Sequence, residues 1–307
     1  MKPLYIWAGG KNKMIKKYLA TPGLPTTGFD TYVEPFFGGG AMMLWVYENC
    51  PDVKRFIMND IKSEIVGIYT AIKTDPESFT NHVDALQDKY ISLDKAGRKE
   101  FYYELRDDYI NDFAKWDSIK ESATLYFMMK TGFNGIWQVN KASKGRFATP
   151  VGLCNQTETV YDKKLVAKWH DFLQLVEIHN GDWYDACKDV ESDTGTFFFM
   201  DPPYRDSFTS YGEGFSDADQ TKLIDFCKQR DQQGDTVFYC NRNGNDGFFE
   251  KHQGNLNMQL YDITYTAGRR KQEEDGGHSA KKAEEVLLHS DISLQTNTTF
   301  DILFGKV

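Results

Sequence analysis

Short apolar runs are the clearest pattern along this chain. They lie at residues 32–34, 55–59, 196–200 and 236–240, and acidic residues follow several of them. Runs of this kind are typical of strands that are buried on both faces of a parallel sheet. A glycine turn and a helical pattern at residues 41–47 separate the first two runs, which predicts a strand–helix–strand unit. The pattern therefore indicates an α/β fold.

Between residues 61 and 168 the apolar positions follow a helical spacing instead. Tyr102 and Leu105 illustrate it, and so do Leu125 and Met129 further along. Residues 131–152 are polar and rich in glycine, so we expect a loop there. Strand patterns return after residue 173, and residues 260–266 and 285–288 are expected to close the sheet as an antiparallel pair. We therefore predict a sheet domain of residues 1–62 and 169–307, interrupted by a mainly helical insert of residues 63–168.

The composition fits a reduced, folded protein with a large core. Of 307 residues, 40% are hydrophobic and 15% aromatic. No run has the length of a membrane span, and the amino terminus does not resemble a signal peptide. Five dispersed cysteines show neither a disulfide pattern nor metal-ligand spacing, so we expect a cytoplasmic protein without a metal. The net charge of −9 argues against a uniformly basic surface, although lysines and arginines cluster near residues 11–17, 141–146 and 269–282.

The tetrad Asp201-Pro202-Pro203-Tyr204 follows the run at residues 196–200. This end of a strand is where open α/β sheets bind ligands. The prolines fix the backbone and remove two N–H donors, so carbonyl groups and the Asp201 carboxylate are available to accept hydrogen bonds from an amine. Tyr204 offers a flat ring for stacking. A simple polar turn is the alternative, but the complete tetrad at this place favours a binding site.

A second candidate site is the turn Gly38-Gly39-Gly40 after the first strand. It matches neither the GxGxxG dinucleotide pattern nor a phosphate-binding loop. Glu34 precedes it and no basic residue belongs to it, which favours an uncharged or cationic ligand. Asp60 ends the next strand, where an acid typically binds ribose hydroxyls. The glycine turn and Asp60 together predict a site for a nucleoside-type cofactor. The alternative is that the glycines serve only close packing and that Asp60 caps a helix.

The segment Glu34-Pro35-Phe36-Phe37-Gly38-Gly39-Gly40 and the tetrad together resemble the motif pair of methyltransferases that use S-adenosylmethionine to methylate amines. The chain most resembles the Dam family of DNA adenine-N6 methyltransferases. Further matches, in the family's order, are Trp7-Ala8-Gly9-Gly10-Lys11, Tyr102-Tyr103-Glu104-Leu105-Arg106, Gly132-Phe133-Asn134-Gly135, Asn140, Gly145-Arg146-Phe147, Pro150-Val151-Gly152, Gly276-Gly277, Lys281-Lys282 and Glu284-Glu285-Val286-Leu287. The resemblance implies a Rossmann-like methyltransferase sheet with an inserted, mainly helical target-recognition domain.

The resemblance also implies a role for each matched residue. The cofactor-binding set is Trp7, Lys11, Glu34, Phe36, Gly38, Gly40, Asp60, Asp182 and Asp201. Asp60 is expected to hold the ribose, and Asp182 to lie beside the adenine of S-adenosylmethionine. The catalytic set is Asp201, Pro202, Pro203 and Tyr204. These residues are expected to hold an adenine that has been flipped out of double-stranded DNA, so that its N6 amine receives the methyl group.

The resemblance assigns DNA recognition to the polar stretch at residues 131–152, called the recognition stretch below. The expected DNA-binding set lies in it. It consists of Phe133, Asn134, Gln138, Asn140, Lys141, Lys144 and Arg146. Phe133 is a candidate wedge between bases and Asn134 a candidate base-edge contact, although a hydrophobic anchor beside a turn-forming asparagine is the alternative. Gln138 stands where the family usually has a guanine-reading arginine, and Ile6 stands where it often has a lysine. Glutamine suits adenine better than guanine, so the family's common GATC target is not expected to carry over.

Other functions remain open at this stage. The same chemistry on the N4 amine of cytosine or on RNA is one alternative. A DNA- or protein-binding module that has lost catalysis is another, which the charge of −9 favours and the intact tetrad disfavours. A protein-glutamine methyltransferase is disfavoured, because such enzymes normally have asparagine at the position of Asp201. The oligomeric state stays open, as do host regulation, partnership with a restriction enzyme and phage self-protection, in the cytoplasm of a bacterial or phage-infected cell.

Overall fold

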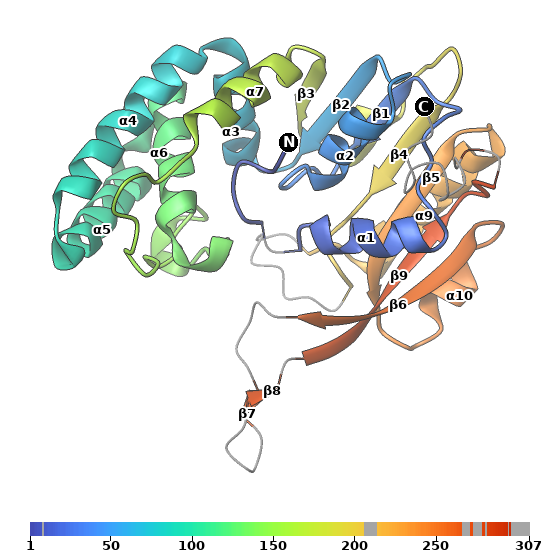
Figure 1. Ribbon diagram of the computed structural model, residues 1–307. Helices are drawn as coiled ribbons and strands as arrows, with labels where there is room; N and C mark the ends of the chain where they lie inside the picture. Colours follow the sequence, from blue (N-terminus) through green and yellow to red (C-terminus); the bar gives the residue numbers. More distant parts are fainter. Residues whose placement is uncertain are drawn as a thin grey trace.

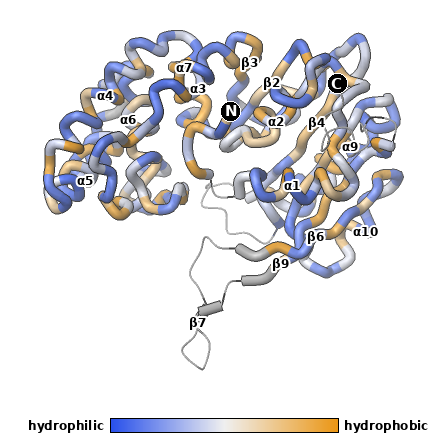
Figure 2. Tube along the Cα trace, viewed as in Figure 1, coloured by the Kyte–Doolittle hydropathy of each residue, from blue (hydrophilic) through white to orange (hydrophobic). Residues whose placement is uncertain are grey.

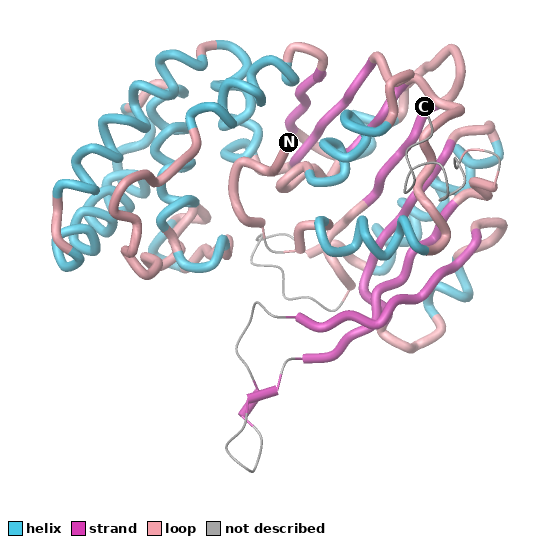
Figure 3. Tube along the Cα trace, in the orientation of Figure 1, coloured by secondary structure: helices cyan, strands magenta, loops and turns pink. Residues whose placement is uncertain are grey.

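The computed structural model describes residues 1–7, 9–205, 214–265, 271–272, 278–279, 281–293 and 295. A twisted sheet with helices on both faces forms one side of the molecule, and a group of helices lies beside it (Figure 1). Figure 3 shows the same separation, with the strands gathered on one side and the helices that connect β2 to β3 on the other.

The sheet has the strand order β3-β2-β1-β4-β5-β9-β6. Its strands are β1 (Thr31–Glu34), β2 (Arg55–Asp60), β3 (Val176–Asn180), β4 (Thr196–Met200), β5 (Thr236–Asn243), β6 (Asn257–Tyr265) and β9 (Lys281–His289). Strands β1 to β5 pair in parallel, whereas β9 runs antiparallel to both β5 and β6. This arrangement confirms the predicted Rossmann-like methyltransferase sheet and its closing antiparallel pair.

The strand order reverses between β1 and β4, which are neighbours in the sheet. Val33 of β1 lies opposite Ile57 of β2 on one side and Phe198 of β4 on the other. The carboxyl ends of β1 and β4 therefore lie side by side at a topological switch point, where α/β sheets bind their ligands. The glycine turn leaves one of these strands and the tetrad leaves the other.

Alternate residues of the strands enter two separate hydrophobic clusters. Tyr32 and Phe197 pack on the face covered by α1 (Asn12–Ala20) and α2 (Ala41–Asn49). Val33 and Phe198 pack on the opposite face, which is covered by α8 (Trp183–Cys187), α9 (Asp217–Gln232) and α10 (Phe248–His252). Burial on both faces explains why the strands are continuous apolar runs in the sequence. Figure 2 shows this hydrophobic character along β4, in contrast with the many hydrophilic positions of the outer helix α4.

The chain between β2 and β3 is mainly helical. It contains α3 (Ser63–Thr74), α4 (Pro76–Ser92), α5 (Lys95–Asp112), α6 (Ser118–Thr131) and α7 (Lys163–Leu173), with short 3-10 helices at Phe113–Lys115, Phe133–Gly135 and Lys141–Ser143. Asp75 and Asp117 begin α4 and α6 by accepting hydrogen bonds from Ser78 N at 3.0 Å and from Lys120 N at 2.8 Å.

Helices α3 and α7 join this helical group to the sheet. Tyr69 of α3 packs edge-on against Phe37 with 4.9 Å between ring centroids. Phe172 of α7 packs in the same way against Phe56 of β2 at 5.3 Å. The two parts of the molecule therefore share one hydrophobic core.

Some elements differ from the pattern-based expectation. Helix α1 was not predicted, because its lysines conceal a buried face formed by Met14, Ile15 and Tyr18. The stretch at residues 131–152 is more ordered than a plain loop, since it contains 3-10 helices and a bridge between Gly132 and Val151.

A few quoted motif residues lie outside the described part of the chain. They are Ala8, Arg269, Arg270, Gly276 and Gly277. A short antiparallel pair of strands flanks Gly276 and Gly277 in the sequence, with β7 (Lys271–Gln272) before them and β8 (His278–Ser279) after them. None of the described helices is long and apolar enough to cross a membrane.

Candidate active site

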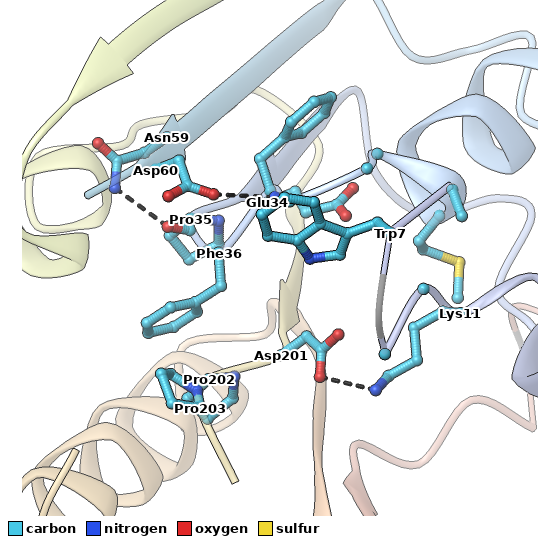
Figure 4. Close-up of a pocket in the computed structure, with 18 of the residues that line it drawn as sticks. Trp7, Lys11, Glu34, Pro35, Phe36, Asn59, Asp60, Asp201, Pro202 and Pro203 are labelled. Atoms are coloured by element: carbon cyan, nitrogen blue, oxygen red, sulfur yellow. Dashed lines mark hydrogen bonds and ion pairs between the residues drawn. The ribbon is translucent and has the colours of Figure 1, made fainter. Parts of the chain in front are cut away.

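A cavity of about 730 Å³ opens at the carboxyl ends of β1, β2 and β4. All nine residues expected to bind the cofactor line it, and so do the four residues of the tetrad. Figure 4 shows Trp7 and Lys11 on one side of this space, Phe36 and Asp60 on another, and Asp201 directed at Lys11. Segments that are almost 200 positions apart in the sequence, such as Lys11 and Tyr204, therefore meet at one site.

The glycine turn brings the backbone very close to aromatic rings. Gly38 and Gly40 have φ angles of +51° and +64°, which side-chain-bearing residues rarely adopt. A Cβ atom at Gly38 would lie 2.6 Å from Nε1 of Trp7, and one at Gly40 would lie 2.2 Å from Cζ of Phe37. Glycine is therefore required at both positions, for the backbone conformation and for the close approach.

Asp60 braces this turn from the end of β2. Its Oδ2 accepts a hydrogen bond from Gly38 N at 2.9 Å, and its Oδ1 accepts one from Lys62 N at 2.9 Å. Burial raises the pKa of Asp60 above its ordinary value, and these two backbone donors partly oppose that shift. Each oxygen keeps lone-pair capacity for a ligand hydroxyl, which agrees with the expected ribose role but does not test it.

Asn59 is a site residue that the sequence reasoning missed. Its side-chain amide donates to Pro35 O and to Gly181 O, both at 3.0 Å. It thereby ties the chain after β1 to the chain after β3. Asp182 follows at once and begins α8 by accepting a hydrogen bond from Tyr184 N at 2.8 Å. The sequence signal for Asn59 was only its position before Asp60.

Glu34 is a buried carboxyl group on the wall of the cavity. Its Oε2 accepts hydrogen bonds from the Tyr32 hydroxyl at 2.8 Å and from Met43 N at 2.9 Å. Burial raises the pKa of Glu34 to about 8, with a smaller contribution from the negative charge of Asp201. At neutral pH this carboxyl group therefore carries a proton, and a cation in the cavity would favour its ionised form.

Asp201 forms an ion pair with Lys11, whose Nζ lies 2.7 Å from Oδ1 of Asp201. Burial raises the pKa of Asp201 to about 6, although Lys11 opposes the shift. Burial alone would lower the pKa of Lys11, but the negative charges around it prevail and raise that pKa well above its ordinary value. Near neutral pH the pair is therefore ionised, with Asp201 as a carboxylate.

Buried polar residues hold the chain that leaves the tetrad. Gln220 donates to Pro203 O at 2.8 Å and accepts a hydrogen bond from the Tyr239 hydroxyl at 2.5 Å. Arg205 is clamped between Asp217 and Asp246. Gln220 could not be predicted from local patterns, because a single glutamine in a helix has no distinguishing signature.

The recognition stretch lies next to this site. Phe133 and Asn134 line a second cavity of about 380 Å³, and Ile6 and Lys130 line both cavities. The Phe133 side chain is 41% exposed, and Asn134 adopts a left-handed conformation with φ of 52°. Gln138 is exposed as well. Phe133 and Asn134 therefore lie beside the first cavity, to which Ile6 and Lys130 connect them.

The remaining members of the expected DNA-binding set are engaged within the protein to different degrees. Asn140 Oδ1 caps the following 3-10 helix by accepting from Ser143 N at 2.9 Å. Arg146 Nη1 lies 2.9 Å from Glu121 Oε1. Lys141 and Lys144 are exposed. DNA contacts by these four residues stay predictions, and for Asn140 and Arg146 the structure provides an internal role as well.

Known proteins are similar in sequence to most of this chain. Residues 7–258 match the family described as D12 class N6 adenine-specific DNA methyltransferase. The chain is 32% identical to the Type II methyltransferase M.MjaIII of Methanocaldococcus jannaschii, over 83% of this chain and 89% of that protein. It is 31% identical to the Type II methyltransferase M1.LlaDCHI of Lactococcus lactis subsp. cremoris, over 87% of this chain and 90% of that protein.

A DNA adenine methylase of Vibrio cholerae is also similar. It is 26% identical over 76% of this chain and 79% of that protein. The family match over residues 7–258 contains the glycine turn, the recognition stretch and the tetrad. The chain belongs to the D12 class of N6 adenine-specific DNA methyltransferases.

Proposed function

We propose that this protein transfers a methyl group from S-adenosylmethionine to the N6 amine of an adenine that has been extruded from duplex DNA. The observation that supports the proposal best is that Asp201 and the glycine turn face the same cavity. A carboxylate that can accept hydrogen bonds from an amine thus lies beside a turn suited to close approach of a cofactor.

The residues of the cavity fit this cofactor. Asp60 and Asp182 give the wall an acidic character, which suits a positively charged ligand and disfavours a diphosphate. A positively charged ligand would also favour the ionised form of Glu34. Trp7 and Phe36 supply aromatic surface beside the glycine turn. When bound, S-adenosylmethionine supplies a methyl group on a positively charged sulfur, which is a strong leaving group. No metal is needed for this transfer.

The tetrad would orient the amine of the target base. Asp201 would accept one amine hydrogen and the Pro202 carbonyl the other, which directs the nitrogen lone pair towards the methyl group. Pro203 is held by Gln220, so the two acceptors keep a fixed spacing. Tyr204 would stack on the flipped base, an interaction worth about 1–3 kcal/mol.

We further propose that residues 63–168 form the target-recognition part and contact duplex DNA. Phe133 would enter the base stack, and Asn134 and Gln138 would contact base edges. The exposure of all three side chains, and the position of Phe133 and Asn134 on the second cavity, support this assignment. A protein acting on DNA in this way would work in the cytoplasm of a prokaryotic or virus-infected cell.

Labelled S-adenosylmethionine and adenine-containing duplex DNA test the proposal. We expect label in DNA and N6-methyladenine on nucleoside mass analysis, and no transfer by Asp201→Ala. Cofactor binding by that variant, measured by calorimetry, controls for an intact cavity. Detection of N4-methylcytosine would show that cytosine is the substrate instead of adenine. Transfer to RNA alone would show that the substrate is RNA instead of DNA. Cofactor binding without transfer to any nucleic acid would favour a catalytically silent module instead.

A further inference from the structure

Glu285 is a carboxylate with no role in the mechanism above, although it lies next to the tetrad. It belongs to β9 and is only 2% exposed. Its Oε1 lies 3.0 Å from Lys11 Nζ and 3.4 Å from the Tyr204 hydroxyl. Among the described residues that line the cavity Glu285 does not occur, so it reaches the site only through these two neighbours.

Lys11 connects Glu285 to the tetrad, and all three of its N–H donors take part in this connection. An ammonium group has three N–H donors. Lys11 Nζ has three acceptors in the structure, which are Asp201 Oδ1 at 2.7 Å, Glu285 Oε1 at 3.0 Å and the Tyr204 hydroxyl at 3.1 Å. The acceptors come from the end of β4 and from β9, whereas Lys11 precedes α1. The position of the ammonium is therefore fixed from several elements.

The charges in this cluster are unbalanced. One buried cation lies between two carboxylates, because Lys11 is 4% exposed and pairs with both Asp201 and Glu285. A buried carboxylate is costly unless it is paired and hydrogen-bonded. A purely apolar side chain at position 285 would pack against its neighbours without that cost, so the presence of the acid calls for an electrostatic explanation.

We propose that Glu285 is a positioning residue for the methyl transfer, which fixes the carboxylate and the aromatic ring of the tetrad through Lys11 and the Tyr204 hydroxyl. This inference rests on the proposed function. Glu285 holds Lys11 at the side of Asp201 Oδ1, which leaves the other oxygen of Asp201 to face the target amine. By accepting a hydrogen bond from Tyr204, it also limits the rotation of the ring on which the base stacks.

The charge of Glu285 has a second effect on Asp201. Glu285 competes with Asp201 for the positive charge of Lys11, and its own negative charge raises the pKa of Asp201. Among the described residues, Glu34 from β1 and Cys240 from β5 also interact electrostatically with Asp201, and the Tyr204 hydroxyl belongs to the same cluster. Without the charge of Glu285, Lys11 would neutralise Asp201 more completely. Asp201 would then be a weaker hydrogen-bond acceptor and would lose its proton at a lower pH.

Glu285→Gln tests the inference, with Glu284→Gln as the matched control. The neighbouring Glu284 lies on the same strand, but its Oε2 accepts a hydrogen bond from Asn243 and it is not in contact with Lys11. Both changes remove one negative charge without changing the size of the side chain. The measurements are the single-turnover methylation rate as a function of pH and the affinity for S-adenosylmethionine.

For Glu285→Gln we expect the rate at neutral pH to fall by about tenfold, because a charged hydrogen-bond network is broken. We expect its acid limb to move down by about one pH unit. Cofactor affinity is expected to stay within about twofold of the wild type, since Glu285 does not line the cavity. Glu284→Gln is expected to match the wild type. A Glu285→Gln profile that coincides with the control profile would overturn the inference.

A second measurement separates this inference from the proposed function. The carboxyl group of Asp201 can be titrated by carbon-13 NMR in the free protein, which needs no DNA. A lowered pKa in Glu285→Gln and an unchanged pKa in Glu285→Asp would support the charge effect even if no substrate were methylated. An equal Asp201 pKa in all three proteins would contradict it. If the glutamine variant does not fold, Glu285→Ser removes the same charge with a smaller side chain and is expected to lower the Asp201 pKa in the same way.

Discussion

At the scale of single residues, Asp201 links the structure to a measurable pH dependence. Its pKa is raised to about 6 by burial, against the opposing effect of Lys11. A carboxylic acid at this position would donate a proton where the mechanism needs an acceptor. We therefore expect the single-turnover rate to fall by about tenfold per pH unit below pH 6, which gives the pH–rate profile an acid limb. An aspartate with an ordinary pKa would place this acid limb near pH 4.

Rapid-quench measurements between pH 4.5 and 8 with saturating cofactor and DNA check this prediction. Asp201→Asn should remove the limb together with nearly all activity. A limb that stays at the same pH in a slow Asp201→Asn variant would show that another group causes it.

Glu34 gives a prediction about stability. Its pKa rises from 4.5 to about 8 on folding, so the folded protein binds a proton that the unfolded chain releases. This contribution is complete below about pH 4.5 and is lost as the pH rises towards 8. Glu34→Gln keeps an oxygen that can accept from Tyr32 and Met43, and it never ionises. We expect the melting temperature of Glu34→Gln, measured relative to that of the wild type at the same pH, to increase between pH 5 and 9.

Thermal unfolding without cofactor, measured across this range, checks the sign. A difference between the two proteins that is independent of pH would contradict the assignment. With S-adenosylmethionine present, the cation in the cavity is expected to favour ionised Glu34, so the variant should bind the cofactor more weakly.

At the scale of elements, the glycine turn separates two causes of destabilisation. Gly40→Ala combines a left-handed backbone with a collision against Phe37, whereas Gly234→Ala has a φ of +93° and open space around its Cβ. We expect losses of about 2–4 kcal/mol for Gly40→Ala and about 1 kcal/mol for Gly234→Ala in urea unfolding. Equal losses would show that Phe37 moves aside at little cost.

Gly38→Ala is a separate test of the same turn. The added methyl group would displace the ring of Trp7, which lines the cavity. We expect cofactor affinity to drop at least about tenfold, with the unfolding free energy changed less than in Gly40→Ala. Calorimetry with S-adenosylmethionine checks this. Unchanged affinity would remove Trp7 from the proposed cofactor contacts.

The same elements show what the sequence allowed us to predict. Strands β1, β2, β4 and β5 were visible because burial on both faces makes each of them an apolar run. Helix α1 was not predicted, because its few buried residues lie among lysines and give no clear apolar pattern.

The supporting residues of the site were not predictable in this way. Glu285 and Gln220 reach the tetrad only because β9 lies next to β5 and because α9 packs under the tetrad exit. Such contacts depend on strand order and helix packing, which leave no mark on local sequence patterns.

At the scale of the whole molecule, we expect the two cavities to divide chemistry from recognition. The larger one is formed mainly by residues at the carboxyl ends of sheet strands, and the smaller one by the recognition stretch, with Ile6 and Lys130 between them. Because the net charge of the chain is −9, we expect DNA to bind to a limited face, which we propose lies around these cavities. Changes in the recognition stretch should therefore alter which adenine is methylated without altering the cofactor site.

Gln138 provides the test of this division, because it is exposed and lines neither cavity. We expect Gln138→Ala to reduce discrimination at one base of the target by about 10- to 100-fold, the loss of one bidentate base contact. Gln138→Arg should move the preference at that base towards guanine, because arginine pairs with the guanine edge. Both variants should bind S-adenosylmethionine like the wild type.

Sequencing of methylated DNA from cells that express each variant gives the target motifs directly. Gln229→Ala is the matched control, since Gln229 is exposed on α9 in the sheet part of the molecule. An unchanged motif in both Gln138 variants would assign base reading to other residues of the recognition stretch. A changed motif with a weakened cofactor site would instead show that recognition and chemistry are coupled through Ile6 and Lys130, the residues shared by the two cavities.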